Sequence, residues 1–197
     1  MNFTEIFRLL SVYLKFLAGA LCCPLIVSVY FEFFCKETMK IFPQSAMAFF
    51  QTILIALFLS VLFKFLGRKS EGKIFRKECL AAAVLIWFLT GAVGALPYWL
   101  SDTLSSPLDC YFESVSGLTT TGATVMHPKK YDEETGDEVN WDVVVEGGKI
   151  TTTYKFYGTV NPIRDSRGSV LYSGIEAVSK GVLFWRSFSQ WLGGMGI

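Results

Sequence analysis

Three long apolar stretches constrain the fold of this chain more than any other feature of its sequence. They run from Leu9 to Phe34, from Ala46 to Leu66 and from Leu80 to Leu100. About 20 helical residues cross the roughly 30 Å hydrocarbon core of a bilayer, so each stretch predicts a transmembrane helix. The composition agrees, because 52% of the 197 residues are hydrophobic and only 18% are charged. The net charge of +1 gives no indication of a nucleic-acid partner.

The orientation of these helices is predicted from the basic residues that follow the second stretch. Five basic side chains outnumber two acidic ones between the second and third stretches: Arg68, Lys69, Lys73, Arg76 and Lys77 against Glu71 and Glu78. Short loops rich in Lys and Arg stay on the cytoplasmic side, so this loop and the N-terminus are both expected there. The alternative is that the first stretch is a signal peptide, but it is longer than a signal h-region and lacks a clean small-residue cleavage site.

A shorter segment from Ser105 to Gly117 has the features of a half-helix. Ser106 is a suitable N-cap, Pro107 occupies the first helical position and Asp109 lies in the first turn. The segment is too short to span the membrane, so we expect it to enter from the external face and stop. Irregular backbone at that depth is tolerated only beside a polar cavity.

The sequence SGLTTTGAT, from Ser116 to Thr124, follows this half-helix directly. A loop with a glycine at Gly122, placed at the negative end of a helix dipole, suits backbone carbonyls that replace the water around a cation. The order of elements therefore predicts an ion-selectivity filter. The alternative is that Thr119, Thr120 and Thr121 form an ordinary extracellular turn.

The segment between this loop and the last apolar stretch predicts a β-hairpin. Apolar and polar or β-branched residues alternate from Trp141 to Glu146 and from Lys149 to Tyr157, around Gly147 and Gly148. In the expected register, Val143 faces Thr152 and Trp141 faces Tyr154. Either residues 168–172 add a third strand, or the hairpin leans on the rim of the pore. The insert is interpreted either as a cap at the pore mouth or as a tolerated loop insertion.

The remaining chemistry-bearing residues do not form an enzyme pattern. The chain has five cysteines, and their spacing is not that of metal ligands. Two alternatives remain for them: a disulfide between Cys35 and Cys110, or free buried thiols. No nucleophile with a nearby base and no phosphate-binding loop is found, so an enzyme is not expected. Arg186, with Trp185 and Trp191, is interpreted as a membrane-interface anchor.

Three blocks of the sequence resemble the TrkH-type potassium transporters of the Trk/Ktr/HKT superfamily. They are GALPYWL at 94–100, YFESVSGLTTTGATV at 111–125 and GVLFWRSFSQWLGGMGI at 181–197, in the order of the family. The resemblance covers most of the chain apart from about 129–172, where this sequence departs from the short connection usual in the family. It implies two extra helices followed by the first of four helix, pore-loop, helix repeats in an all-α integral membrane protein, with an extracellular β-hairpin insert. Each repeat of such a K⁺-channel-like pore supplies one filter segment.

The resemblance also implies roles for individual residues. The filter would comprise Thr120, Thr121, Gly122 and Ala123, with K⁺ held by the carbonyls of Thr120 and Thr121. The loop would be supported by Thr119, Thr124, Ser116 and Glu113. K⁺ is then the transported ion, and a bound cofactor is not expected.

The implied partners are the lipid bilayer, the remaining repeats of the same transporter, a second copy in a homodimer and a cytoplasmic TrkA-like nucleotide-binding regulatory subunit. The implied location is the bacterial cytoplasmic (inner) membrane. Residues 1–78 would form the extra helix pair and a cytoplasmic loop, 79–126 the first outer helix with its half-helix and filter, 127–180 the insert, and 181–197 the start of the second helix of the repeat.

The last apolar segment, 182–197, would rise only about 24 Å as a helix, which leads us to expect an N-terminal fragment of a longer transporter. Three functions are therefore weighed: a subunit of a potassium pore, a membrane-anchored external binding module, and an inactive fragment.

Overall fold

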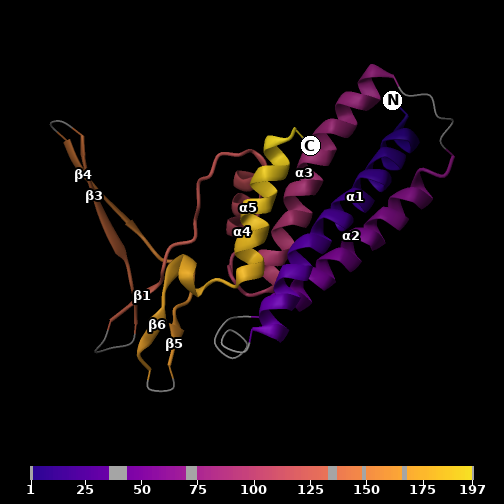
Figure 1. Ribbon diagram of the computed structural model, residues 1–197. Helices are drawn as coiled ribbons and strands as arrows, with labels where there is room; N and C mark the ends of the chain where they lie inside the picture. Colours follow the sequence, from indigo (N-terminus) through magenta and orange to yellow (C-terminus); the bar gives the residue numbers. More distant parts are fainter. Residues whose placement is uncertain are drawn as a thin grey trace.

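The computed structural model describes residues 2–35, 44–69, 75–132, 137–147, 150–165 and 168–196. The fold is mostly helical (Figure 1). Its α-helices are α1 (Phe3–Val29), α2 (Ala46–Leu66), α3 (Arg76–Leu100), α4 (Pro107–Leu118) and α5 (Lys180–Gly194). A π-helical turn, η1 (Tyr30–Phe34), extends α1, and a 3₁₀ turn, η2 (Gly174–Ala177), precedes α5.

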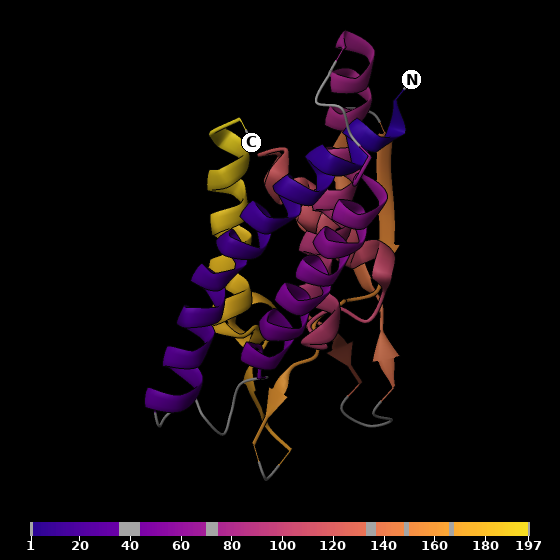
Figure 2. The same ribbon diagram turned by 90° about the vertical axis from the view of Figure 1, so that its right-hand side faces the viewer.

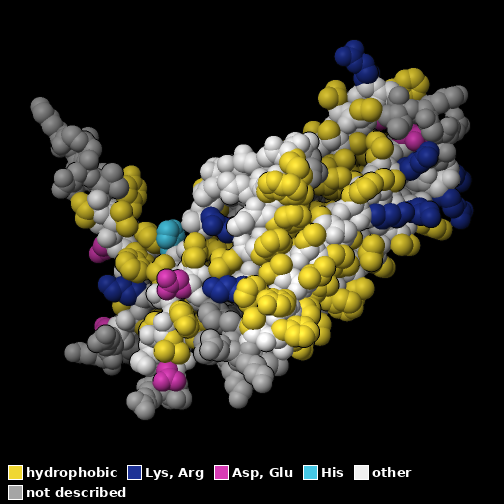
Figure 3. Space-filling model, in the orientation of Figure 1, with side chains coloured by type: hydrophobic (Ala, Val, Ile, Leu, Met, Phe, Trp, Pro, Cys, Tyr) yellow, Lys and Arg dark blue, Asp and Glu magenta, His cyan; other side chains and the backbone are white. Residues whose placement is uncertain are grey.

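Three helices, α1 with η1, α2 and α3, are long and apolar enough to cross a membrane. Two of them start earlier than their apolar stretches, α1 at Phe3 and α3 at Arg76. Hydropathy marks only the apolar part of a helix, whereas the backbone hydrogen bonds continue into the polar turn before it. Large apolar side chains such as Phe16, Phe58 and Phe88 are exposed, as is expected of residues that contact lipid. Figure 3 shows hydrophobic side chains spread over the surface of the helices.

Helices α1 and α2 pack side by side along their length (Figure 2). Leu14, Leu21, Phe49 and Ala56 are fully buried in the core of the protein. The side chain of Ser60 donates a hydrogen bond of 2.8 Å to the Ser11 carbonyl. The small serine side chains thus allow the two helices to approach closely, and the buried Ser60 hydroxyl has a hydrogen-bond partner.

The N-terminus of α2 is capped by a side chain from the end of the first helix. Glu32 accepts hydrogen bonds from the backbone N–H of Ala46 at 3.0 Å and from the Ser45 hydroxyl at 3.0 Å. A carboxylate at this position satisfies unpaired N–H groups and complements the positive end of the helix dipole. Glu32 therefore connects the ends of α1 and α2.

The strands form three separate two-stranded antiparallel sheets. The pairs are β1 (Lys130–Tyr131) with β2 (Glu138–Val139), β3 (Trp141–Gly147) with β4 (Ile150–Phe156), and β5 (Ile163–Arg164) with β6 (Val170–Tyr172). Figure 1 shows β3 and β4 projecting sideways, away from the helices. The predicted third strand pairs with β5 and not with β3 or β4.

The predicted register of the long hairpin is wrong by two residues. Val143 pairs with Tyr154 and Trp141 with Phe156, so that 148 and 149, which lie outside the described residues, connect the strands. A slip of two residues leaves every side chain on the same face of the sheet, and alternation of apolar and polar residues cannot detect it.

Candidate selectivity filter

The short helix α4 is held between α3 and α5 by contacts at small residues. A Cβ added to Gly94 of α3 would overlap the Ser114 hydroxyl of α4, and one added to Gly117 of α4 would overlap the Ser189 hydroxyl of α5. Trp185 of α5 is fully buried and donates a hydrogen bond of 3.0 Å to the Gly94 carbonyl. At 12 residues, α4 is about 18 Å long, too short to cross a bilayer.

The C-terminus of α4 ends in a Schellman arrangement. The N–H of Thr120 donates to the Gly117 carbonyl at 3.0 Å, and the N–H of Thr121 donates to the Ser116 carbonyl at 3.1 Å. This motif requires a left-handed residue, usually glycine, and here Thr120 takes that conformation with φ of 57°. A β-branched residue at positive φ is strained. Gly122, two residues later, also has a positive φ, of 73°.

The loop after α4 presents its backbone to the outside of the helix bundle. Residues 119–123 are all exposed. No described residue donates a hydrogen bond to the carbonyl oxygens of Thr120, Thr121 or Gly122. The Ala123 carbonyl differs, because it accepts a hydrogen bond of 2.6 Å from the Ser116 hydroxyl. Among the carbonyls of residues 120–123, one is therefore anchored, and the other three have no donor among the described residues.

Glu113 holds the returning part of the loop from the side facing α4. Its carboxylate, 1% exposed, accepts hydrogen bonds from the Thr124 hydroxyl at 3.0 Å and from the Val125 N–H at 3.1 Å. The Nε of Arg186, on α5, lies 2.5 Å from the other carboxylate oxygen. A buried carboxylate is costly unless it is paired and hydrogen-bonded, and here both conditions are met.

The end of the loop is fixed by residues that follow the long hairpin. The Thr159 hydroxyl donates to the Val125 carbonyl and accepts a hydrogen bond of 3.2 Å from the His127 N–H. The Val160 N–H donates to the His127 carbonyl at 3.0 Å. The chain that follows the long hairpin thus returns to the residues directly after the loop.

The structure corrects the interpretation of Arg186 and Trp185 as interface anchors. Trp185 is buried against Gly94, and Arg186 pairs with Glu113, while Trp191 is 58% exposed. A charged residue within an apolar helix indicates a partner of opposite charge but not which one. The partner is Glu113, which was expected only to support the loop. The role of Thr159 carried no signal in the sequence.

The cysteines form no disulfide. All five are thiols, and Cys110 is buried with its sulfur 3.5 Å from the Leu104 carbonyl. Of the two alternatives for Cys35 and Cys110, the disulfide is therefore not formed.

Comparison with known proteins gives relatives over the whole chain, although no family model matches it. The chain is 26% identical to the Trk system potassium uptake protein TrkH of Escherichia coli K12 over 198 residues. Over 88% of its own length, the chain is 27% identical to an uncharacterized cation transporter of Methanocaldococcus jannaschii. The chain spans 29% of the E. coli protein and 24% of the archaeal one.

The fold has a solved counterpart. The crystal structure of the potassium transporter TrkH from Vibrio parahaemolyticus matches with a TM-score of 0.64 and 25% identity, covering 100% of this chain and 30% of that one. Sequence and structure comparisons thus agree, and they confirm the resemblance to the TrkH-type potassium transporters. The matches cover the whole chain, including 129–172, where a departure from the family was expected.

Proposed function

We propose that the loop after α4 is one segment of a potassium-selectivity filter, and that the chain serves potassium uptake across a bacterial cytoplasmic membrane. The observation that carries this proposal is the contrast between the two sides of the loop. Toward α4, Ser116 and Glu113 hold Ala123, Thr124 and Val125 by hydrogen bonds. On the exposed side, the carbonyls of Thr120 and Thr121 have no donor among the described residues.

Two physical features favour a cation at this position. Open carbonyl oxygens can replace the hydration shell of a potassium ion, provided that their backbone is held in place. The C-terminus of α4 lies at the loop and contributes partial negative charge. In this proposal the carbonyls of Thr120, Thr121 and Gly122 face the ion, while Thr119, Ser116 and Glu113 support the loop.

A single loop cannot surround an ion, so the proposal includes three further filter segments from the remaining repeats of the same transporter. Residues 1–78 are then the extra helix pair, 79–126 the first part of a repeat, 127–180 an extracellular insert and 181–197 the start of the closing helix. By the same resemblance we propose a homodimer with a cytoplasmic TrkA-like nucleotide-binding regulatory subunit, and an N-terminus in the cytoplasm.

The proposal is tested in a chimera in which this chain replaces its matching segment of E. coli TrkH. We expect the chimera to restore growth on low potassium, and rubidium uptake, to a bacterium lacking potassium uptake. Gly122→Ala should abolish the uptake, because an L-residue is strained at φ of 73°. Gly19→Ala is the matched control, since a Cβ there meets no atom within 4 Å. Uptake that is unchanged by Gly122→Ala contradicts the filter assignment.

A second candidate function is an external binding module carried by the long hairpin. The observation that favours it is the exposure of apolar side chains on β3 and β4, among them Val144 at 56% and Tyr154 at 58%. Replacing 141–156 by a short Gly-Ser linker in the chimera separates the two functions. If potassium uptake survives and binding to an external partner is lost, the hairpin serves binding and the loop after α4 serves transport.

A further inference from the structure

A groove of about 530 Å³ lies between α1 and α2, at the end of the bundle where α2 ends and α1 begins. Four basic side chains line it: Arg8, Lys15, Lys64 and Arg68. Among the described residues that line it, none is acidic. Figure 3 shows Lys and Arg side chains gathered at this end of the helix bundle, whose surface is otherwise rich in hydrophobic side chains.

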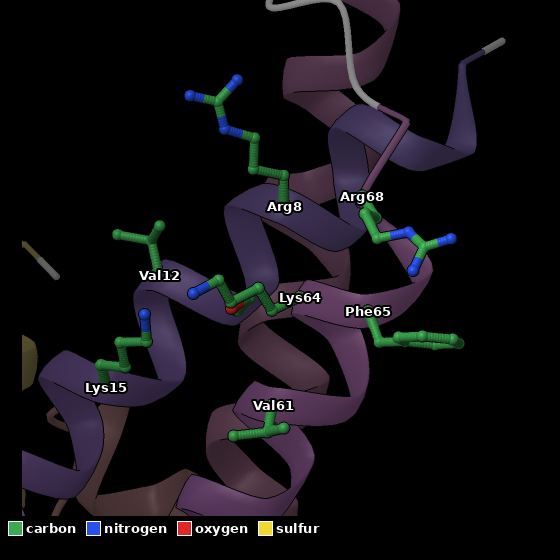
Figure 4. A pocket seen from close by; sticks show the side chains of 9 residues that line it. Arg8, Val12, Lys15, Val61, Lys64, Phe65 and Arg68 are labelled. Atoms are coloured by element: carbon green, nitrogen blue, oxygen red, sulfur yellow. The ribbon is translucent and has the colours of Figure 1, made fainter.

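The two lysines are the centre of this charge. Figure 4 shows Lys64 extending from α2 toward α1, and Lys15 pointing along α1 toward the same space. Within the described ranges of the chain, neither lysine forms an ion pair. Arg68, in contrast, places its guanidinium over the Phe65 ring, 5.0 Å from the ring centre. Two ammonium groups on adjacent helices repel one another unless an anion lies between them.

Besides the basic residues and the buried Ser11, the groove is lined by exposed apolar side chains. Val12 is 47% exposed, Val61 65% and Phe65 64%, and all three line the groove beside the lysines. Lys15 lies about 10 Å farther along α1 than Arg8, because seven helical residues separate them. On α1, Val12 lies between Arg8 and Lys15, and on α2, Val61 lies three residues farther from the helix end than Lys64. Basic groups beside exposed apolar side chains match the headgroup and the acyl chain of one phospholipid.

We propose that this groove binds an anionic phospholipid, with its phosphodiester between Lys15 and Lys64 and an acyl chain that continues along Val61 into the bilayer. Charge complementarity selects an anionic headgroup, since basic pockets between transmembrane helices on the cytoplasmic side bind such lipids. The apolar side chains select a lipid over free phosphate, which would leave that surface uncovered. The proposal requires only that α1 and α2 lie in a bilayer, and it is independent of potassium transport.

The test uses the full chain reconstituted in phosphatidylcholine bilayers with a trace of spin-labelled lipid. The motionally restricted fraction of spin-labelled phosphatidylglycerol is compared with that of spin-labelled phosphatidylcholine. We expect a several-fold preference for phosphatidylglycerol. The K15Q/K64Q variant should bring the ratio close to one, because it removes both charges that contact the phosphodiester.

Two controls make the result specific. R76Q/K77Q removes two exposed basic residues from the start of α3, at the same end of the bundle but outside the groove, and should keep the preference. K15R/K64R keeps the charge and should also keep it, which separates loss of charge from loss of fold. Equal restriction of the two lipids by the unchanged chain overturns the proposal. A second result also overturns the proposal: inorganic phosphate removes the preference, while sodium chloride of equal ionic strength does not. The site would then bind a free anion and not a lipid.

Discussion

Arg186 of α5 and Glu113 of α4 form an ion pair directly beside the loop that we propose as a filter segment. The same carboxylate accepts hydrogen bonds from Thr124 and Val125, so one buried group joins two helices to the returning strand of the loop. The position of α5 is therefore coupled to the position of the loop. Neither residue needs to touch an ion to affect how an ion is bound.

Arg186→Gln should destabilise the chain strongly, because it leaves the Glu113 carboxylate buried without a cation. Removing one partner of a buried pair costs about 3–5 kcal/mol, and we expect the lower part of that range because Arg186 is 26% exposed and the carboxylate keeps two hydrogen bonds. The measurement is the free energy of unfolding in detergent. In the chimera, rubidium uptake should fall together with the free energy of unfolding.

The double variant Glu113→Gln with Arg186→Gln supplies the control. It removes both charges, so its loss of stability should be smaller than the sum of the two single losses by about 1–3 kcal/mol. Arg186→Lys, which keeps the charge, should cost less than Arg186→Gln. Losses that simply add would show that the two side chains do not interact.

Thr120→Gly should be tolerated far better than the neighbouring Thr119→Gly. Thr120 has φ of 57°, a conformation that costs an L-residue roughly 1–2 kcal/mol and glycine almost nothing. Thr119 has an ordinary φ of −83°, and its hydroxyl donates a hydrogen bond of 2.8 Å to the Val115 carbonyl. Both variants exchange threonine for glycine, so the change in unfolded-state entropy cancels between them.

The difference in unfolding free energy is thus the quantity to measure, and we expect Thr120→Gly to be more stable by about 1–2 kcal/mol. Equal stability of the two variants would mean that Thr120 is not held in the left-handed conformation.

The long helices and the half-helix could be predicted because they depend on local patterns. Hydropathy identified the three spans, and Pro107 at the first helical position marked the start of α4. The end of α4 was placed one residue early, at Gly117 instead of Leu118, because the Schellman bonds that close the helix use Thr120, a residue that rarely fits this position.

Contacts between segments far apart in the chain could not be predicted from local sequence patterns. Nothing local indicates that Arg186 reaches Glu113 or that Thr159 bonds to Val125, since each pair is joined only by packing of α5 and by the return of the insert. The hairpin register also escaped prediction, because two registers that differ by two residues bury the same faces.

Gly193→Ala should destabilise the contact between α5 and α4. A Cβ at this position would overlap the backbone carbonyl of Leu118, which cannot move aside as a flexible side chain can. Overpacking of this kind costs about 1–3 kcal/mol. Gly19→Ala, at an open helical position on α1, should instead stabilise the chain by about 0.5–1 kcal/mol. Thermal unfolding of both variants in detergent checks the signs, and a neutral Gly193→Ala would contradict the close contact.

Cys110 should be almost unreactive toward a maleimide at pH 8. Burial, with a smaller contribution from the charge of Asp109, raises the pKa of its thiol to about 11. Only about one thiol in a thousand is then the reactive thiolate at pH 8, and the labelling rate should rise about tenfold per pH unit up to pH 10. The measurement uses a variant in which Cys110 is the only cysteine, with the same variant unfolded in detergent at pH 8 as the control. Folded chain that labels as fast as unfolded chain at pH 8 would show that Cys110 is accessible and that α4 does not pack as described.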